Sequence, residues 1–427
     1  MPLAIHRPPS ATRPLALAAL LGLVPACQFA VPADGLTYRC EADGGCPTGL
    51  VCVSQGAFGL CLRPDAGTSD GGTVDAGTSD GGLDAGGVDA GKNDGGALDG
   101  GAPLAVYDLI FDNADGGSLD GFPVLIAIAG DSIRAATIQD PRTQLRFFDP
   151  DTQTDLPFQI DTWAPNAESL VWVRVPNIAP TRTDRITLMV GPDAGGHEDA
   201  TGQSVFGAYA GVWHLGPGAL DDSSGSGHHG TSVGAGLDAG FLGSAVTYVS
   251  TGDEHVELDG GDALFNGWGA FTLELWLRAD YATVSASFGE HGVLDQGGGI
   301  SLGRVFAVGN APNRSLVFQT DMHFTPNAEA AYLNAELPLQ QWTWFVYTFD
   351  GHTIVMYADG VEATRQELTS AASKLLASQN PLFFGDRSGP LLGGLDEVRI
   401  SRTAFSPAWI AAQHRSMRRS FVTLVRR

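Results

Sequence analysis

Alternation of apolar and polar residues between positions 212 and 400 limits the possible folds of this chain more than any other feature. In residues 271–278 every second residue is Phe or Leu, so one face of an extended strand is apolar, which predicts a sheet packed on one side. Residues 342–349 are apolar on both faces, which is typical of a central strand in stacked sheets. The pattern predicts antiparallel sheets around a large core.

Asp-Gly pairs mark the turns of this region. Asp350-Gly351 ends the aromatic strand, and Asp359-Gly360 follows a return strand at residues 353–357. Glycine adopts positive φ without a Cβ clash, so both pairs suit tight hairpin turns. We therefore expect three consecutive strands in a meander.

The same region contains six short motifs in a definite order: Gly211-Val-Trp-His-Leu215, Asp222-Ser-Ser-Gly225, Phe271-Thr-Leu-Glu-Leu-Trp276, Trp342 with Tyr347 and Phe349-Asp-Gly351, Tyr357-Ala-Asp-Gly360, and Gly394-Leu-Asp-Glu-Val-Arg-Ile400. In this order they resemble the bacterial laminin-G-like, concanavalin-A-like jelly roll. The resemblance covers residues 207–405 and implies two antiparallel sheets, as in lectin-type sandwiches. It implies no particular reaction.

Residues 104–206 contain a second set of strand patterns: Phe122-Pro-Val-Leu125, Leu145-Arg-Phe-Phe-Asp149, the segment 158–163, Val171-Trp-Val-Arg-Val-Pro176 and Leu188-Met-Val-Gly191. These motifs resemble the bacterial domain of unknown function 2341, which commonly precedes a laminin-G-like domain. The resemblance implies a first β-sandwich at residues 104–206. The expected fold class is therefore all-β, with two β-sandwich domains, the second a concanavalin-A-like jelly roll.

The beginning of the chain has the features of an export signal. The apolar run at residues 15–24 follows two arginines and is too short to span a bilayer, as in a signal-peptide core. Val24-Pro-Ala-Cys27 resembles the lipobox of bacterial lipoproteins. The resemblance implies removal of residues 1–26, lipidation of Cys27, and a bacterial outer-membrane lipoprotein exposed at the cell surface and held to the membrane by this anchor. Ordinary cleavage after Ala26 is the alternative.

Cysteine use agrees with an oxidising compartment. Lipidation of one of the five cysteines leaves four in a Cys-rich module at residues 27–63, namely Cys40, Cys46, Cys52 and Cys61. The module has too little apolar surface to fold without cross-links, so we expect two disulfides, with three possible pairings. Zinc bound by these thiolates is the alternative, although the spacings are wider than those of common zinc motifs.

The composition predicts a spacer, and the net charge restricts the partners. Residues 64–103 consist almost entirely of Asp, Gly, Ala, Ser and Thr, which predicts a disordered linker with a span of roughly 35 Å. The formal net charge of −24 argues against nucleic acid as a partner, because phosphates need Lys and Arg counterions.

Asp222 and Asp396 are the candidate metal ligands. Laminin-G-like domains often bind calcium where the beginning of the domain meets its last strand, so the resemblance implies calcium at these two carboxylates. The alternative is that Asp222 caps a Ser-Gly turn and that Asp396 accepts backbone hydrogen bonds near the closing strand.

The aromatic residues divide into two groups. Trp268, Tyr281 and Phe324 lie in loop-like stretches, where exposed rings could stack on sugars, and are the candidate ligand-binding residues. Four others are expected in the core: Trp213, Trp276, Trp342 and Trp344.

The last residues of the chain contain a helix-capping pattern. In residues 406–427, Ser406 followed by Pro predicts a short helix, with a strand at 420–425.

We expect a lectin-like surface module that recognises carbohydrate or a surface protein and is no enzyme. A structural adhesion or envelope-assembly protein is one alternative. A degenerate glycoside hydrolase is another, because Glu257-Leu-Asp259 lacks the third acid of laminarinase-type enzymes.

Overall fold

The structure is a computed structural model of the chain. It describes residues 38–40, 51–55, 58–62, 105–216, 220–249, 252–261, 264–282, 290–295, 301–309, 315–376, 380–386 and 391–427. The chain divides into two compact units, Met1–Asn93 and Asp94–Arg427. Among the described residues, no helix is long and apolar enough to cross a membrane.

In the first unit the described residues form a small antiparallel sheet in the order β1-β3-β2. Its strands are β1 (Tyr38–Cys40), β2 (Val51–Gln55) and β3 (Phe58–Leu62). Cys52 and Cys61 are register partners across β2 and β3. Cys27, Cys46 and the expected linker at 64–103 lie outside the described residues.

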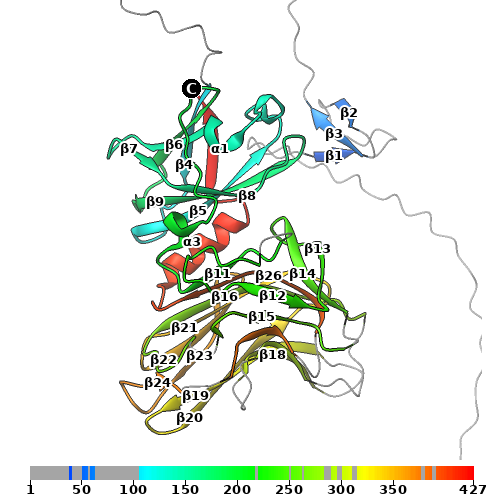
Figure 1. Cartoon of the computed structure of the whole chain (residues 1–427), viewed down its shortest axis with the longest axis vertical. Helices are drawn as coiled ribbons and strands as arrows, with labels where there is room; N and C mark the ends of the chain where they lie inside the picture. Colours follow the sequence, from blue (N-terminus) through cyan, green and yellow to red (C-terminus); the bar gives the residue numbers. More distant parts are fainter. Residues whose placement is uncertain are drawn as a thin grey trace, which may run out of the picture. The chain divides into compact units, whose positions relative to one another are not determined.

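The second unit contains two β-sandwiches (Figure 1). The first sandwich stacks a five-stranded sheet, β27-β4-β10-β6-β7, on a three-stranded sheet, β5-β9-β8. Its elements are β4 (Ala105–Phe111), β5 (Leu119–Ala129), η1 (Ala135–Thr137), α1 (Pro141–Gln144), β6 (Leu145–Asp149), β7 (Thr154–Leu156), β8 (Phe158–Thr162), β9 (Glu168–Ile178), β10 (Arg185–Val190) and β27 (Val422–Arg426).

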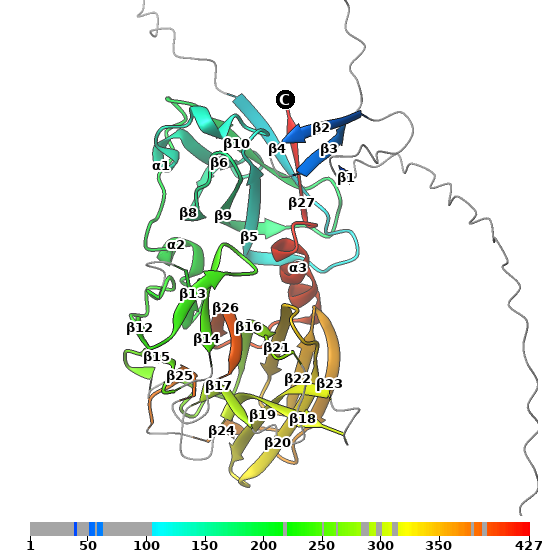
Figure 2. The same cartoon turned by 90° about the vertical axis from the view of Figure 1, so that its right-hand side faces the viewer.

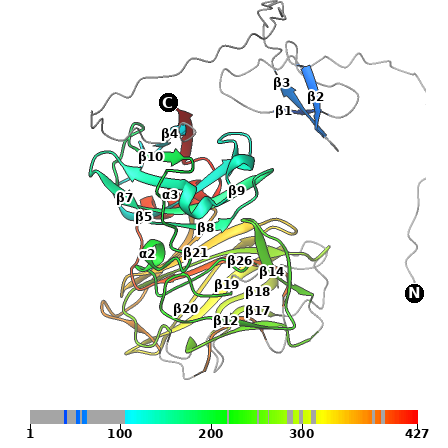
Figure 3. The ribbon, with the colours of Figure 1, turned by 45° about the horizontal axis from the view of Figure 1, so that its top comes forward.

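The end of the chain completes this first sandwich. Ser406 Oγ accepts a hydrogen bond from the Trp409 amide (3.2 Å) and caps α3 (Pro407–Met417), as expected from the sequence. Strand β27 then pairs antiparallel with β4, so the C-terminus lies beside the strand that opens the sandwich (Figure 3). The tail is therefore an integral strand of the first sandwich, and the second sandwich is inserted between β10 and β27.

The second sandwich consists of two larger antiparallel sheets. The inner sheet has the order β13-β14-β26-β16-β21-β22-β23, with β11 paired to β26, and the outer sheet has the order β12-β15-β25-β17-β18-β19-β20, with β24 paired to β19. The inner strands are β11 (Gly211–Trp213), β13 (Gly236–Ala239), β14 (Ser244–Val249), β16 (Phe271–Ala279), β21 (Thr343–Phe349), β22 (Thr353–Ala358), β23 (Val361–Glu367) and β26 (Leu392–Ser401). The outer strands are β12 (Gly230–Val233), β15 (His255–Leu258), β17 (His291–Asp295), β18 (Ser301–Val308), β19 (Ser315–Thr325), β20 (Glu329–Leu337), β24 (Lys374–Leu375) and β25 (Phe383–Gly385).

The predicted meander is confirmed. Strands β21, β22 and β23 are consecutive neighbours in the inner sheet. Asp359 and Gly360 have φ of 47° and 78°, which is the conformation of a tight hairpin turn, and Gly351 has φ of 97°. Local periodicity and turn chemistry therefore specify this part of the sheet.

The central strands of the inner sheet, β26, β16 and β21, are buried on both faces. Phe271, Leu273 and Leu275 face the core between the two sheets, as the alternation predicts. The expectation of a sheet packed on one side only is wrong, because Glu274 and Trp276 on the opposite face are also buried. Aromatic and aliphatic residues of the first sandwich, of α2 (Gln203–Phe206) and of α3 cover that face.

We call this covered layer the seam, and its buried residues include Trp172, Phe206, Trp276, Trp344, Ile410 and Met417. Figures 1 and 2 show α3 lying between the two sandwiches, where Ile410 and Met417 join the seam. The core placement expected for three tryptophans is confirmed, since Trp213, Trp276 and Trp344 are fully buried, and Trp342 is partly buried against the seam.

Candidate functional site

A β-bulge in β26 places two neighbouring acidic side chains in the seam. Glu274 on β16 is opposite Arg399, whereas Trp276 is opposite Asp396, so β26 contains one extra residue between these pairs. Glu397 occupies the bulge with φ of 51°, an uncommon conformation for a residue other than glycine. Both Asp396 and Glu397 therefore lie on the seam face.

Glu397 is the centre of a buried ionic group. Its Oε2 accepts hydrogen bonds from Arg399 Nη2 (2.5 Å) and Nε (3.2 Å), and its Oε1 lies 2.7 Å from His214 Nδ1. Burial raises the pKa of this carboxyl, but the positive charges of His214 and Arg399 outweigh burial and lower it to about 2. Glu397 is therefore ionised, and His214 Nδ1 donates to it.

His214 follows β11 at the joint between the sandwiches. Its Nε2 lies 3.3 Å from Gln159 Oε1, and its ring stacks on Trp172 at 6.2 Å between centroids. Burial lowers the pKa of His214, but the negative charge and hydrogen bond of Glu397 outweigh burial and raise it. Both ring nitrogens can then donate, which is the pattern of an imidazolium.

Two further acids of the seam are protonated more easily than usual. Burial raises the pKa of Glu274 to about 7, and both of its carboxyl oxygens lack hydrogen-bond partners within the described chain. Burial also raises the pKa of Asp396 well above its ordinary value.

The Arg399 guanidinium lies 4.1 Å from the Trp172 ring centre, so it is held by a cation-π contact as well as by Glu397.

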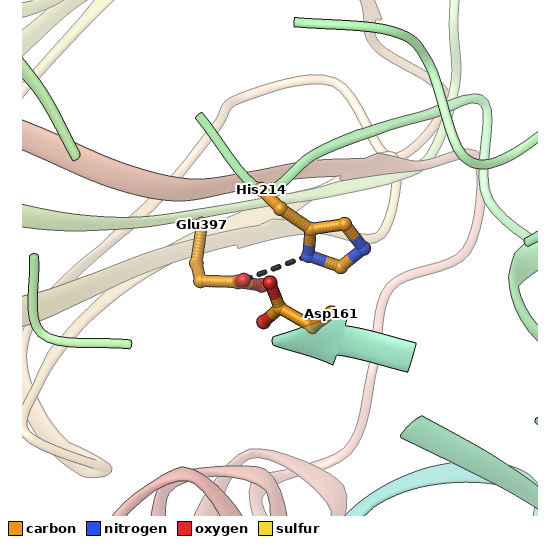
Figure 4. Close-up of side chains that lie close together, drawn as sticks. All are labelled: Asp161, His214 and Glu397. Carbon is orange, nitrogen blue, oxygen red and sulfur yellow. Dashed lines mark hydrogen bonds and ion pairs between the residues drawn. The ribbon is translucent and has the colours of Figure 1, made fainter. Parts of the chain in front are cut away.

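Asp161, near the end of β8, brings the first sandwich into this group. One carboxylate oxygen of Asp161, one ring nitrogen of His214 and one carboxylate oxygen of Glu397 all lie within 4.8 Å of one another. Within the described residues, this is the one set of three acidic, histidine or cysteine side chains that could hold a metal ion. Figure 4 shows the two carboxyl groups and the imidazole turned toward one another. Burial raises the pKa of Asp161 to about 6.

A pocket of about 500 Å³ opens beside this group. Its polar lining consists of Arg142, Gln159, Asp161, Thr201, His214, Asp221, Asp222, Ser223 and His229. The first four belong to the first sandwich, and the others belong to the segment that begins the second sandwich. The two sandwiches therefore share one polar pocket at the edge of the seam.

Comparison with protein families identifies both sandwiches. The family described as "Concanavalin A-like lectin/glucanases superfamily" matches residues 250–411, and the family "Domain of unknown function (DUF2341)" matches residues 142–213. The chain carries a DUF2341 domain followed by a concanavalin A-like domain. The resemblances to these two families that were inferred from the motifs at 104–206 and 207–405 are confirmed. No curated protein matches the chain.

Solved structures similar to this chain cover about half of it. Domain 4 of AbnA, an arabinanase from Geobacillus stearothermophilus in complex with arabinotriose, has 18% identity and a TM-score of 0.35 over 48% of this chain and 98% of that one. The binding domain of Paraclostridial Mosquitocidal Protein 1 has 12% identity and a TM-score of 0.39, over 49% and 52%. The binding domain of Botulinum neurotoxin DC in complex with rat synaptotagmin II has 14% identity and a TM-score of 0.39, over 49% and 52%. The chain thus spans about half the length of these toxin binding domains.

The structure corrects the expected aromatic binding residues. Phe324 lies in β19 and is fully buried, and Trp268 is 8% exposed within the same core of the concanavalin A-like domain. Their expected exposure in loops is wrong, because both rings fill the space between the two sheets. Tyr281 is partly buried, and its hydroxyl accepts a hydrogen bond from the Leu392 amide (3.1 Å). These rings do not form an exposed stacking surface.

Asp222 and Asp396 accept hydrogen bonds from backbone amides, which is the alternative to calcium binding that the sequence left open. Asp222 accepts hydrogen bonds from the amides of Val212 (3.0 Å), Ser224 (2.9 Å) and His228 (3.2 Å). Asp396 Oδ2 accepts from the Leu242 amide (2.8 Å), while its Oδ1 has no hydrogen-bond partner in the described chain. The set of three side chains that could hold a metal contains neither aspartate.

Asp161, His214 and Glu397 are not among the site residues expected from the sequence. His214 and Glu397 were visible only as members of the motifs at 211–215 and 394–400, and Asp161 only within the segment 158–163. Two neighbouring acids at 396 and 397 were a usable signal, because a regular strand points neighbours to opposite faces and only a bulge brings both to one face.

Proposed function

We propose that this protein is a binding module whose ligand is a carbohydrate and whose ligand site is the polar pocket between the DUF2341 domain and the concanavalin A-like domain. The observation that carries the proposal is the lining of the pocket. Carboxylate, guanidinium, amide, hydroxyl and imidazole groups converge there from both domains. Such groups donate and accept hydrogen bonds in the paired arrangement that vicinal sugar hydroxyls require.

The size and the polarity of the pocket both favour a small polar ligand. A volume of about 500 Å³ falls within the range that holds small molecules. The polar side chains named above contain no aromatic ring other than two imidazoles, so recognition by hydrogen bonds replaces the ring stacking expected from the sequence. Arg142 contacts Glu198 (3.1 Å) and Asp221 contacts His229 (3.3 Å), but their side chains are 70% and 79% exposed, so a ligand can reach both of them.

A glycan array tests this proposal with matched variants of the full chain. Arg142→Gln and Asp221→Asn should each weaken binding of the best glycan by about tenfold, since each removes a charged hydrogen-bonding group. Arg182→Gln is the control, because Arg182 is similarly exposed (65%) and pairs with Asp112 outside the pocket. An array without any bound glycan contradicts the proposal and leaves recognition of a surface protein as the explanation.

We also propose that the module is displayed by a bacterial outer-membrane lipoprotein anchored through Cys27. Support comes from the signal-like run at residues 15–24, the lipobox-like motif before Cys27 and the spacer composition of residues 64–103. Metabolic labelling with palmitate should mark the wild-type chain, and Cys27→Ser should abolish the label. Labelling that persists in the variant contradicts the anchor.

We propose that the module binds carbohydrate and does not hydrolyse glycosidic bonds. Glu257 lies on β15 and is exposed, which agrees with a solvated strand face. Incubation with β-glucans should release no reducing ends. Release that disappears in Glu257→Gln would establish the hydrolase alternative instead.

A further inference from the structure

Asp161, His214 and Glu397 are far apart in the sequence and meet at one point. Asp161 belongs to the DUF2341 domain, His214 to the joint between the domains, and Glu397 to the last strand of the concanavalin A-like domain. Their donor atoms all lie within 4.8 Å of one another. We propose that these three side chains form a binding site for a divalent transition-metal ion, with zinc as the ion that fits best.

The donor types decide which ion is expected. One imidazole nitrogen and two carboxylate oxygens are ligands that zinc accepts in sites with three protein ligands. Calcium takes oxygen ligands only, so His214 argues against calcium at this point. The proposed site also differs from the calcium site that the laminin-G resemblance implies, because it contains neither Asp222 nor Asp396.

The two glutamate oxygens have separate partners. Arg399 binds Oε2 of Glu397, which leaves Oε1 directed to His214 Nδ1. The contact of His214 Nε2 with Gln159 Oε1 (3.3 Å) holds the proton on Nε2, so that Nδ1 is the nitrogen left for a metal. Glu397 and His214 are 0% and 5% exposed, so bulk water competes little for either donor.

Asp161 has an unsatisfied oxygen at the same point. Its Oδ2 is hidden from solvent and has no hydrogen-bond partner within the described chain. Buried polar atoms without partners are uncommon, and coordination of an ion is one recognised way to satisfy such an atom. A cation bound by Asp161, His214 and Glu397 would satisfy this oxygen.

Metal binding at this site needs no reactant other than the ion, because one proton leaves as the ion enters. In the metal-free protein, a proton on His214 Nδ1 bridges to Glu397. The divalent ion takes the place of that proton, which leaves to solvent, and the Nδ1 lone pair binds the ion. Asp161 and His214 also line the pocket, so the open coordination position of the ion would face it and hold water.

Calorimetric titration of the full chain with zinc chloride, under oxidising conditions, tests the site. We expect wild type to bind zinc and Asp161→Asn to bind it at least about tenfold more weakly at this site. The matched control is His323→Gln, because His323 Nε2 and Asp321 Oδ1 form a similar pair (3.2 Å) on β19, outside the pocket. The control should bind zinc as wild type does.

Cobalt provides a second measurement that does not depend on a variant. Cobalt bound by one imidazole and two carboxylates should give visible absorption bands in the wild-type chain, and zinc should remove them. Absence of both zinc binding and the cobalt bands overturns the proposal. Equal zinc binding by Asp161→Asn and wild type also overturns it, because the ion would then be held elsewhere, for example by cysteine thiolates.

The outcome is separable from that of the carbohydrate proposal. Glycan binding is measured with EDTA present, and zinc binding is measured without glycan. Zinc binding together with a blank array would leave the metal site standing and remove only the carbohydrate.

Discussion

The inner and outer sheets of the concanavalin A-like domain carry the same three residue types on the faces that point away from their shared core. On the inner sheet, Arg399 binds Glu397, and both side chains are 0% exposed. His214 completes this group at 2.7 Å from Glu397. The first sandwich and α3 cover the group, so its three side chains are at most 5% exposed.

On the outer sheet, an arginine, an acid and a histidine meet near the surface. Arg304 Nη2 lies 3.6 Å from Asp321, and His323 Nε2 lies 3.2 Å from the same carboxylate. Arg304 also contacts Glu290 at 3.1 Å. The Arg304 side chain is 23% exposed and that of His323 is 31% exposed, so water solvates these charges.

The difference shows that the same ion pair has a different energetic role on each face. A charge in water loses little when its partner is removed, because solvent replaces the partner. A charge in the seam has no such replacement, so removal of one partner leaves the other buried and unpaired. The seam group should therefore hold the two domains in one arrangement, whereas the outer group should contribute little to stability.

Arg399→Met should have the largest effect on stability. Methionine fills part of the space of the arginine stem, but Glu397 loses its closest partner. Breaking a buried pair in this way costs about 3–5 kcal/mol of the free energy of unfolding. Urea unfolding of the full chain in the presence of EDTA measures the loss. A loss below about 1 kcal/mol would make the seam group equivalent to a surface pair.

Phe421→Ala should have the next largest effect. Phe421 precedes β27, is 1% exposed, and packs against Phe111 and Phe122 with ring centres 5.9 and 5.8 Å apart. Truncation of a buried phenylalanine costs about 3–4 kcal/mol, through lost burial and the remaining cavity. The strand that follows α3 should then detach from β4 and expose the core of the first sandwich.

The control for Phe421→Ala is Tyr332→Ala on the outer sheet. The Tyr332 residue is 53% exposed on β20, so its removal should change the free energy of unfolding by less than about 0.5 kcal/mol. Proteolysis should cleave the Phe421 variant near its C-terminus and spare the Tyr332 variant. Equal resistance of both variants would contradict a structural role of β27 in the first sandwich.

Sequence reasoning identified the parts of the fold that depend on neighbouring residues. The alternation in 271–278 gave β16 its core face, and the Asp-Gly pairs gave the meander its turns. The pattern could not show that Glu274 would be buried, because the atoms that cover it come from the first sandwich and from the tail. Pairing of β27 with β4 joins the two ends of the unit, and no local pattern reports such a contact.

The candidate site could be predicted only in part for a related reason. The resemblance pointed to Asp396, whereas its neighbour Glu397 makes the closest contacts in the structure. The bulge that turns both side chains to one face is a property of the paired strands and not of the local sequence. Asp161 and His214 had no local feature that separates them from other polar residues. The aromatic residues were misplaced because a loop-like composition around Trp268 also occurs where a loop packs its ring inward.

Glu274→Gln should change the pH dependence of stability on the seam face. Burial raises the pKa of Glu274 from 4.5 to about 7 in the folded protein. The folded state therefore holds a proton that the unfolded state has released, so this contribution is complete below pH 4.5 and is lost as pH rises through about 7. The loss amounts to up to about 3 kcal/mol, because one pKa unit corresponds to about 1.4 kcal/mol.

The glutamine side chain of this variant has no proton to lose, so Glu274→Gln should gain stability relative to wild type as pH rises from 4.5 to about 8. Urea unfolding at several pH values gives this difference, and Glu336→Gln on an exposed position of β20 is the control. A difference between Glu274→Gln and wild type that stays constant with pH would show that Glu274 titrates as it does in water.

Arg304→Met should have the smallest effect, and it completes the comparison with Arg399→Met. Arg304 has three polar partners on the outer sheet, Glu290, Asp321 and Gln319. By number of contacts it resembles Arg399, so a count of ion pairs would predict similar losses for the two variants. Because water can solvate Glu290 and Asp321 after the substitution, we expect a loss below about 1 kcal/mol, which should decrease further in high salt. Parallel urea titrations of both variants, at low and high salt, measure the two losses. Similar losses would mean that the number of partners, and not their burial, determines the stability of each face.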